Sequence, residues 1–75
     1  MNKDDIRRSL NIINHHFNIV GRHMTVLVDG EDVGVMITDY STDDIIQQFQ
    51  GDMNTIAWFL KGVQEAIKTM TYEGY

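Results

Sequence analysis

The chain has 75 residues, and its 11 acidic side chains outnumber its 6 lysines and arginines, so the formal net charge is −5 at neutral pH. A chain of this length buries roughly 60% of its unfolded surface, which is enough for one small core. Two-domain enzymes, doubly wound nucleotide-binding folds and barrels are therefore excluded. The hydrophobic fraction of 43% and the charged fraction of 23% are typical of a globular domain. We expect a single small domain over residues 1–75.

Cysteine and proline are both absent from the sequence. Without cysteine, the chain has neither a disulfide framework nor a thiolate metal site. Asp4 and Asp5 stand where a secretory signal peptide would be basic, and the longest apolar run, near residues 56–60, is too short to span a membrane. These features predict a cytoplasmic protein that does not associate with membranes.

The N-terminal segment is predicted to be a helix. Asn2 is its candidate cap, two acids occupy its first turn, and apolar residues recur at helical spacing at Ile6, Leu10 and Ile13. Its end is open to two interpretations. The helix either continues to a C-terminal cap at Gly21, or stops near residue 14 and is followed by a strand over residues 16–20.

The middle of the chain has the pattern of a β-hairpin. Two runs of alternating apolar residues, 23–29 and 32–39, flank Gly30-Glu31, a two-residue turn with glycine first. This register pairs Val28 with Val33, and it places six apolar side chains on one face. A strand over residues 16–20 would pair with the same hairpin and complete a three-stranded meander. We therefore expect a small antiparallel sheet, either a hairpin or a meander.

The C-terminal part is predicted to be helical. Ser41-Thr42-Asp43-Asp44 is typical of a helix start, and Gly51-Asp52 is typical of a helix end followed by a new cap. We expect two helices, over residues 42–50 and 52–70, and a frayed tail over residues 71–75. One continuous helix is the alternative, because apolar residues from Phe49 to Met70 repeat every 3.5 residues, as in a coiled-coil seam.

Together these elements predict an α+β fold with one sheet face packed on the two C-terminal helices. The expected core contains sixteen apolar side chains: Ile6, Leu10, Ile13, Phe17, Met24, Val26, Val28, Val33, Val35, Ile37, Phe49, Met53, Ile56, Leu60, Val63 and Ile67.

No residue pattern points to catalysis. The histidines, His15, His16 and His23, lack the spacing of a zinc site, and the acids around the hairpin turn do not form a calcium loop. Ser9 has no positioned base, and the scattered glycines form no phosphate-binding loop. We therefore expect no catalytic residue, no cofactor and no metal.

The distribution of charge is the feature that bears on function. Between residues 29 and 52 the chain has seven acids and neither lysine nor arginine, so this segment predicts an acidic surface that attracts a basic partner and repels phosphate backbones. Trp58 is of a residue type enriched at interfaces. The predicted partner-binding residues are Asp29, Glu31, Asp32, Asp39, Asp43, Asp44, Asp52 and Trp58.

Two functions are consistent with these observations. The first is a non-enzymatic inhibitor or regulator that presents its acidic face to a basic protein, with no direct nucleic-acid binding. In element order, size and acidity the chain resembles small phage-encoded inhibitors, including anti-CRISPR proteins that imitate DNA; it shares no motif with them, so the resemblance covers the layout alone. The second is a structural protein that forms a homodimer through its long C-terminal helix.

Overall fold

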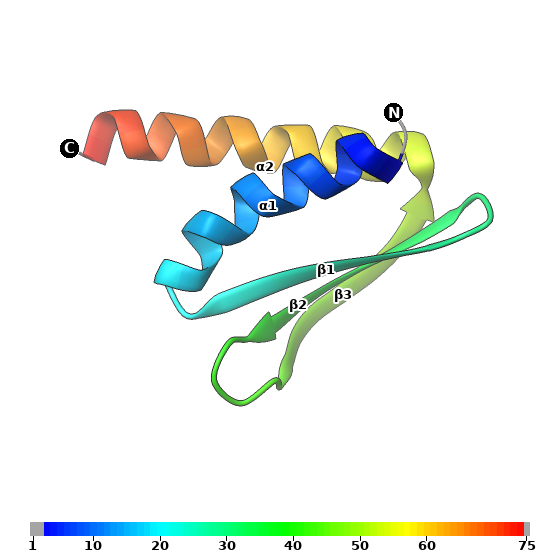
Figure 1. The fold of residues 1–75 in the computed structure, drawn as a ribbon, viewed down its shortest axis with the longest axis horizontal. Helices are drawn as coiled ribbons and strands as arrows, with labels where there is room; N and C mark the ends of the chain where they lie inside the picture. The colour runs from blue at the N-terminus through cyan, green and yellow to red at the C-terminus, as the bar shows by residue number, and fades with distance from the viewer. Residues whose placement is uncertain (1–2, 75) are drawn as a thin grey trace.

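The computed structural model describes the backbone of residues 3–74 and the side chains of residues 3–69. The elements follow the order α1 (Lys3–Ile19), β1 (Arg22–Asp29), β2 (Asp32–Asp39), β3 (Ile45–Asp52) and α2 (Met53–Gly74). Both helices lie on the same side of one antiparallel sheet, whose strand order is β1-β2-β3 (Figure 1). The α+β class and the small antiparallel sheet are therefore confirmed. The sheet has three strands, but its third strand is β3 and the expected meander with residues 16–20 is wrong.

Helix α1 continues through Ile19, so the strand expected over residues 16–20 is wrong. The helix persists because Ile13 and Phe17 extend its apolar stripe onto the core, which outweighs the low helix propensity of the residues between them. It ends in a turn at Gly21, whose φ of 81° lies in the left-handed region that glycine adopts without steric cost. The cap assigned to Asn2 lies outside the described residues.

The hairpin of β1 and β2 has the predicted turn and register. Gly30, with a φ of 64°, opens the two-residue turn. Val28 pairs with Val33, and the register continues through Val26 with Val35. The alternation of apolar residues on both strands fixes this register, because a slip by one residue would turn the apolar side chains to solvent.

The third strand is β3, where the sequence predicts a helix over residues 42–50 instead. The expectation of two C-terminal helices, and the alternative of one helix from residue 42, are both wrong. Ser41 and Thr42 lie in the loop between β2 and β3, where their backbone N–H groups donate to the Asp39 carboxylate at 2.9 and 3.1 Å. Serine, threonine and aspartate favour turns through the same hydrogen bonds that cap helices, so their presence does not distinguish the two structures.

Helix α2 begins directly after β3, and Asp52 caps it as predicted. The Thr55 backbone N–H donates to Asp52 Oδ1 at 2.7 Å, which satisfies one of the free donors of the first turn. The helix continues through Gly74, so the tail expected from residue 71 is helical as far as residue 74; Tyr75 lies outside the described residues. No described helix is both long enough and apolar enough to cross a bilayer.

The core lies between the sheet and the two helices. Seven buried apolar side chains form its centre: Ile6, Ile13, Met24, Val33, Val35, Ile56 and Leu60. The remaining nine residues of the predicted core pack against this centre while partly buried, and Phe59 is the one addition that the sequence prediction omitted. Phe59 meets Phe49 edge to face at a ring separation of 4.7 Å, so this ring pair joins α2 to β3.

Two polar contacts hold α1 in place. The buried Ser9 hydroxyl donates to Gln64 Oε1 at 2.9 Å, which joins α1 to α2. The Asn14 side chain accepts from the Met24 backbone N–H at 2.7 Å and donates to the Met24 carbonyl at 2.9 Å. Asn14 thus makes the hydrogen bonds that another strand would make at this edge of β1.

Candidate interaction surface

The side of the sheet that faces away from the helices, here called the open face, is the main surface left uncovered by the fold. The strand register arranges its residues in four rungs, each with one residue from β1, β2 and β3 in turn. The rungs are Asp29–Asp32–Asp52, Leu27–Gly34–Gln50, Thr25–Met36–Gln48 and His23–Thr38–Ile45. Among the strand residues of this face, the acidic side chains are therefore confined to the first rung, and the next two rungs are neutral.

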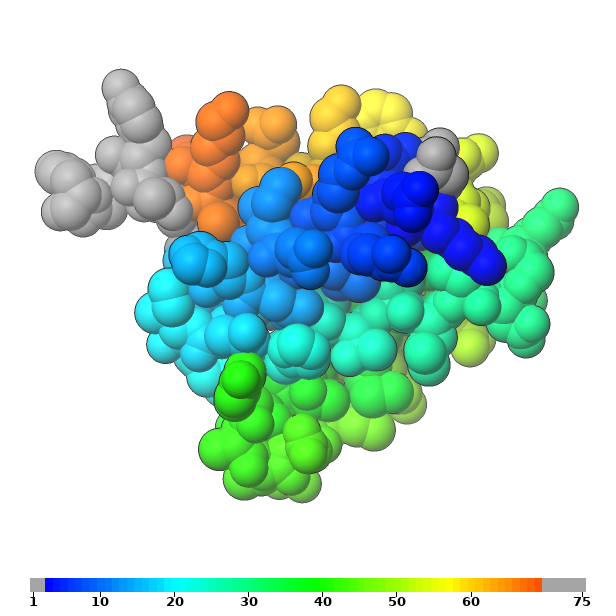
Figure 2. Space-filling view, viewed as in Figure 1, coloured from blue at the N-terminus to red at the C-terminus, as the bar shows by residue number. Residues whose placement is uncertain are grey.

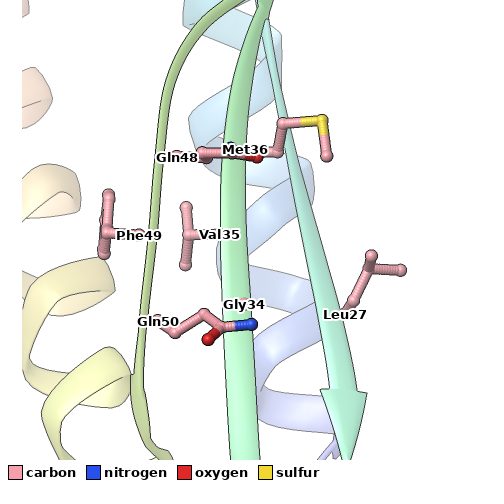
Figure 3. A pocket seen from close by; sticks show the side chains of 7 residues that line it. All are labelled: Leu27, Gly34, Val35, Met36, Gln48, Phe49 and Gln50. Carbon is pink, nitrogen blue, oxygen red and sulfur yellow. The ribbon is translucent and has the colours of Figure 1, made fainter.

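A shallow hollow of about 550 Å³ lies over the middle of the sheet. Gly34, which has no side chain, lies in its lining between Leu27 on β1 and Gln50 on β3. In Figure 3, Leu27 and Met36 extend to one side of the strands, whereas Val35 and Phe49 extend to the other. Leu27 is 62% exposed, so this surface offers apolar contact area as well as glutamine side chains.

The predicted acidic surface is divided into two groups by the sheet. The first group, the hairpin-end acids, comprises Asp29, Glu31, Asp32 and Asp52. The second group, the loop acids, comprises Asp39, Asp43 and Asp44, at the junction of β2 with β3. The β1–β2 turn and the β2–β3 loop lie at opposite ends of the sheet (Figures 1 and 2). Because β2 has eight residues, its ends are about 23 Å apart.

Three of the hairpin-end acids occupy one rung of the sheet. Asp29, Asp32 and Asp52 stand side by side across the three strands, because Asp32 is the register partner of both others. Like charges directly opposite one another on a sheet repel, which a cationic partner would relieve. The Thr55 hydrogen bonds hold the pKa of Asp52 below its usual value, which keeps this carboxylate ionised.

Two of the loop acids, Asp39 and Asp43, contribute to the structure of their own loop. Asp39 Oδ1 accepts from the Ser41 hydroxyl at 2.8 Å as well as from the two backbone N–H groups of the loop, and these bonds lower the pKa of Asp39. Its other oxygen lies 3.7 Å from Arg22 Nη1, so part of its charge is neutralised locally. Asp43 adopts a φ of 64°, a conformation that aspartate tolerates better than most residues. These bonds give Asp39 a structural reason to be present.

Trp58 does not join the open face. It belongs to α2, which packs on the covered side, so the sheet separates Trp58 from the hollow. The indole is 73% exposed and lies beneath the Lys61 ammonium at 5.4 Å, a cation–π contact within the same helix. The structure therefore brings together four of the eight predicted partner-binding residues, and it separates the loop acids and Trp58 from them.

The histidines are likewise dispersed. His15 and His16 lie on α1, and His23 lies on β1, where its Nδ1 is 3.2 Å from Asn18 Oδ1 and its ring meets Tyr40 edge to face. Among the residues that the structure describes, no three histidine, cysteine or acidic side chains gather in a way that could hold a metal ion.

The neutral residues of the open face are the part of the surface that the sequence prediction missed. Leu27, Met36 and Gln48 lie on the strands between core positions, and reading them as a surface requires knowing that β3 is a strand. The available signal was the alternation itself: a hairpin with one apolar face also defines the residues of the opposite face.

Comparison with known proteins finds no matching family model, no similar curated protein and no similar solved structure.

Proposed function

We propose that this chain is a non-enzymatic protein-interaction module, an inhibitor or regulator that binds a basic protein partner through the open face and the hairpin-end acids. The observation that carries the proposal is the layout of this face, in which a neutral hollow borders a rung of three aspartates. Interfaces commonly combine a weakly charged centre with a polar rim. The rim attracts the partner, and the hollow supplies contact area.

The charge of the rim sets the class of partner. Three carboxylates in one rung favour lysine and arginine side chains, and they repel the phosphates of a nucleic acid. The three strands, all of them described, have Arg22 as their sole basic residue besides His23, and Arg22 lies at the end remote from the hairpin-end acids. The face thus favours a basic protein over a nucleic acid.

The homodimer through the C-terminal helix has less support. Ile56 and Leu60, at the centre of the 3.5-residue repeat, are buried against the sheet and α1 within one chain. Val63 and Ile67 pack against the same core. Over the described side chains of α2, residues 53–69, the repeat is therefore used in folding the monomer and does not form a free seam.

The test is capture of a partner by the tagged chain from a nuclease-treated lysate of the source organism, with washes at low and then high salt and identification by mass spectrometry. We expect one stoichiometric basic protein, released by high salt because the rim contacts are exposed. The double variant Asp29→Asn/Asp32→Asn should weaken this capture.

The matched control is Asp43→Asn/Asp44→Asn, which removes the same charge from the other end of the sheet. We expect this control to capture the partner nearly as well as the unaltered chain. Equal loss in both double variants would show that net charge alone drives capture, and a complex that resists high salt would contradict the role of the rim.

A further inference from the structure

The two edges of the sheet are treated differently by the fold. At the β1 edge, the Asn14 side chain of α1 takes up both the N–H and the carbonyl of Met24. Arg22 adds a charged side chain near the start of this edge. The β1 edge is thus blocked to another strand at Met24, near its start.

The β3 edge has no comparable protection. From Ile45 to Gly51 the strand has neither a charged residue nor a proline, which are the usual devices against edge pairing. The register shift opposite Ile37 and Thr38 falls at the start of the strand, so the pairing with β2 is regular from Gln47 onward. Val35 and Phe49 are register partners. In an antiparallel ladder, alternate residues direct their N–H and C=O groups away from the neighbouring strand. On β3 the outward residues are Gln48 and Gln50, because the Met24 N–H already points away from β2.

We propose that β3 is a self-pairing edge, through which two copies of this chain form an antiparallel β3–β3 contact and one continuous six-stranded sheet. This inference goes beyond the proposed function, and it uses the backbone edge of β3 in place of the centre of the open face or the seam of α2. Its partner is a second copy of this chain because the strand is self-complementary about Phe49.

The two-fold axis is expected at Phe49. With Phe49 opposite Phe49 of the second copy, Gln48 of each copy pairs with Gln50 of the other, and the amide side chains meet across the new ladder on the open face. The Phe49–Phe59 ring pair of one copy then lies beside the same pair of the other. The contact therefore adds an aromatic cluster on the side of the helices.

Charge opposes this arrangement only at its two ends. Antiparallel pairing about Phe49 places Asp52 of the two copies about 20 Å apart, but it brings Asp52 of each copy near the loop acids of the other. Association of two chains of net charge −5 should therefore strengthen as salt screens this repulsion. A basic partner would find no carboxylate between residues 45 and 51 of this strand. A longer sheet is moreover a common source of stability for small chains without disulfides.

The first test measures mass by sedimentation equilibrium over a range of concentrations. The unaltered chain should approach twice the 8.7 kDa mass of one chain as concentration rises. Gln48→Pro removes an outward N–H that β2 does not use, so it should remain monomeric at every concentration. Gln48→Thr keeps that N–H and should still dimerise. A monomeric unaltered chain, or a folded Gln48→Pro variant that still dimerises, would overturn the proposal.

The second test needs no proline and fixes the register. Because the chain has no cysteine, Gln48→Cys and Gln50→Cys each introduce a unique thiol. Directly paired strand residues are separated by a distance that a disulfide can bridge. Mixed and oxidised, the two variants should form mainly the mixed disulfide. A predominance of either symmetric disulfide would contradict the register, and failure to cross-link at high concentration would contradict the contact.

Discussion

The two faces of the sheet follow the same alternation but have opposite compositions. On the covered face, Val33 and Val35 are buried against the helices, whereas on the open face their chain neighbours Gly34 and Met36 border a shallow hollow. One residue of displacement along β2 thus separates a position that stabilises the fold from a position available to a partner. The covered face is therefore recognised by its buried apolar side chains, and the open face by the absence of charged side chains in its middle rungs.

The largest expected effect is the substitution Val35→Lys on the covered face. Val35 is 2% exposed at the centre of the sheet, so an ammonium group there would lose its hydration without a partner. We expect a loss of several kcal/mol, comparable with the whole stability of a small domain. Circular dichroism should show a largely unfolded chain at room temperature. A cooperative melt near that of the unaltered chain would show that the covered face is assigned wrongly.

A smaller effect is expected for Asn14→Ala, which removes the side chain that hydrogen-bonds the outer edge of β1. The substitution leaves the Met24 N–H and carbonyl without their present partners, at a cost of about 1–2 kcal/mol. Asn11→Ala is the matched control, because Asn11 is exposed on the same helix and should change stability by less than about 0.5 kcal/mol. Urea denaturation of both variants measures the difference; equal losses would show that the Asn14 contacts contribute nothing specific.

The smallest effect concerns pH and the acids at the two ends of the sheet. The pKa values of Asp39 and Asp52 are lowered in the folded state by hydrogen bonds, so their contribution to stability is complete above the ordinary value of 3.8 and is lost as pH falls through the lowered values. The urea midpoint should therefore fall on acidification below about pH 4.

The double variant Asp39→Asn/Asp52→Asn provides the comparison for this pH series. Asparagine retains an oxygen that can accept the same backbone hydrogen bonds, but it has no carboxyl group to titrate. Its urea midpoint should depend less steeply on pH than that of the unaltered chain. Identical pH profiles for the two proteins would contradict the role assigned to these carboxylates.

The core could be predicted from the sequence because the buried apolar residues recur at the spacing of a helix or a strand. All sixteen predicted core residues belong to the core or pack against it, and the hairpin register followed from the alternation of Val26, Val28, Val33 and Val35. These positions are determined by local geometry, since each strand or helix repeats its inward face at a fixed interval.

The third strand could not be predicted because its local signals are ambiguous. Ser41 and Thr42 are equally suited to a helix cap and to a hairpin loop, and β3 directs Phe49 as its one large apolar side chain toward the core. What decides the structure is the need of the β2 edge for a partner, which is a tertiary effect. The sequence likewise predicts one acidic surface, because the division of the acids into two groups depends on the path of β3.

The measurement that tests the account most directly compares Met36→Lys with the unaltered chain in both melting temperature and partner capture. Met36 adjoins Val35 in sequence but lies on the open face, so Met36→Lys should melt within a few degrees of the unaltered chain while losing the captured basic protein. A variant that unfolds would contradict the assignment of the two faces, and a folded variant that binds as before would contradict the open face as the site of interaction.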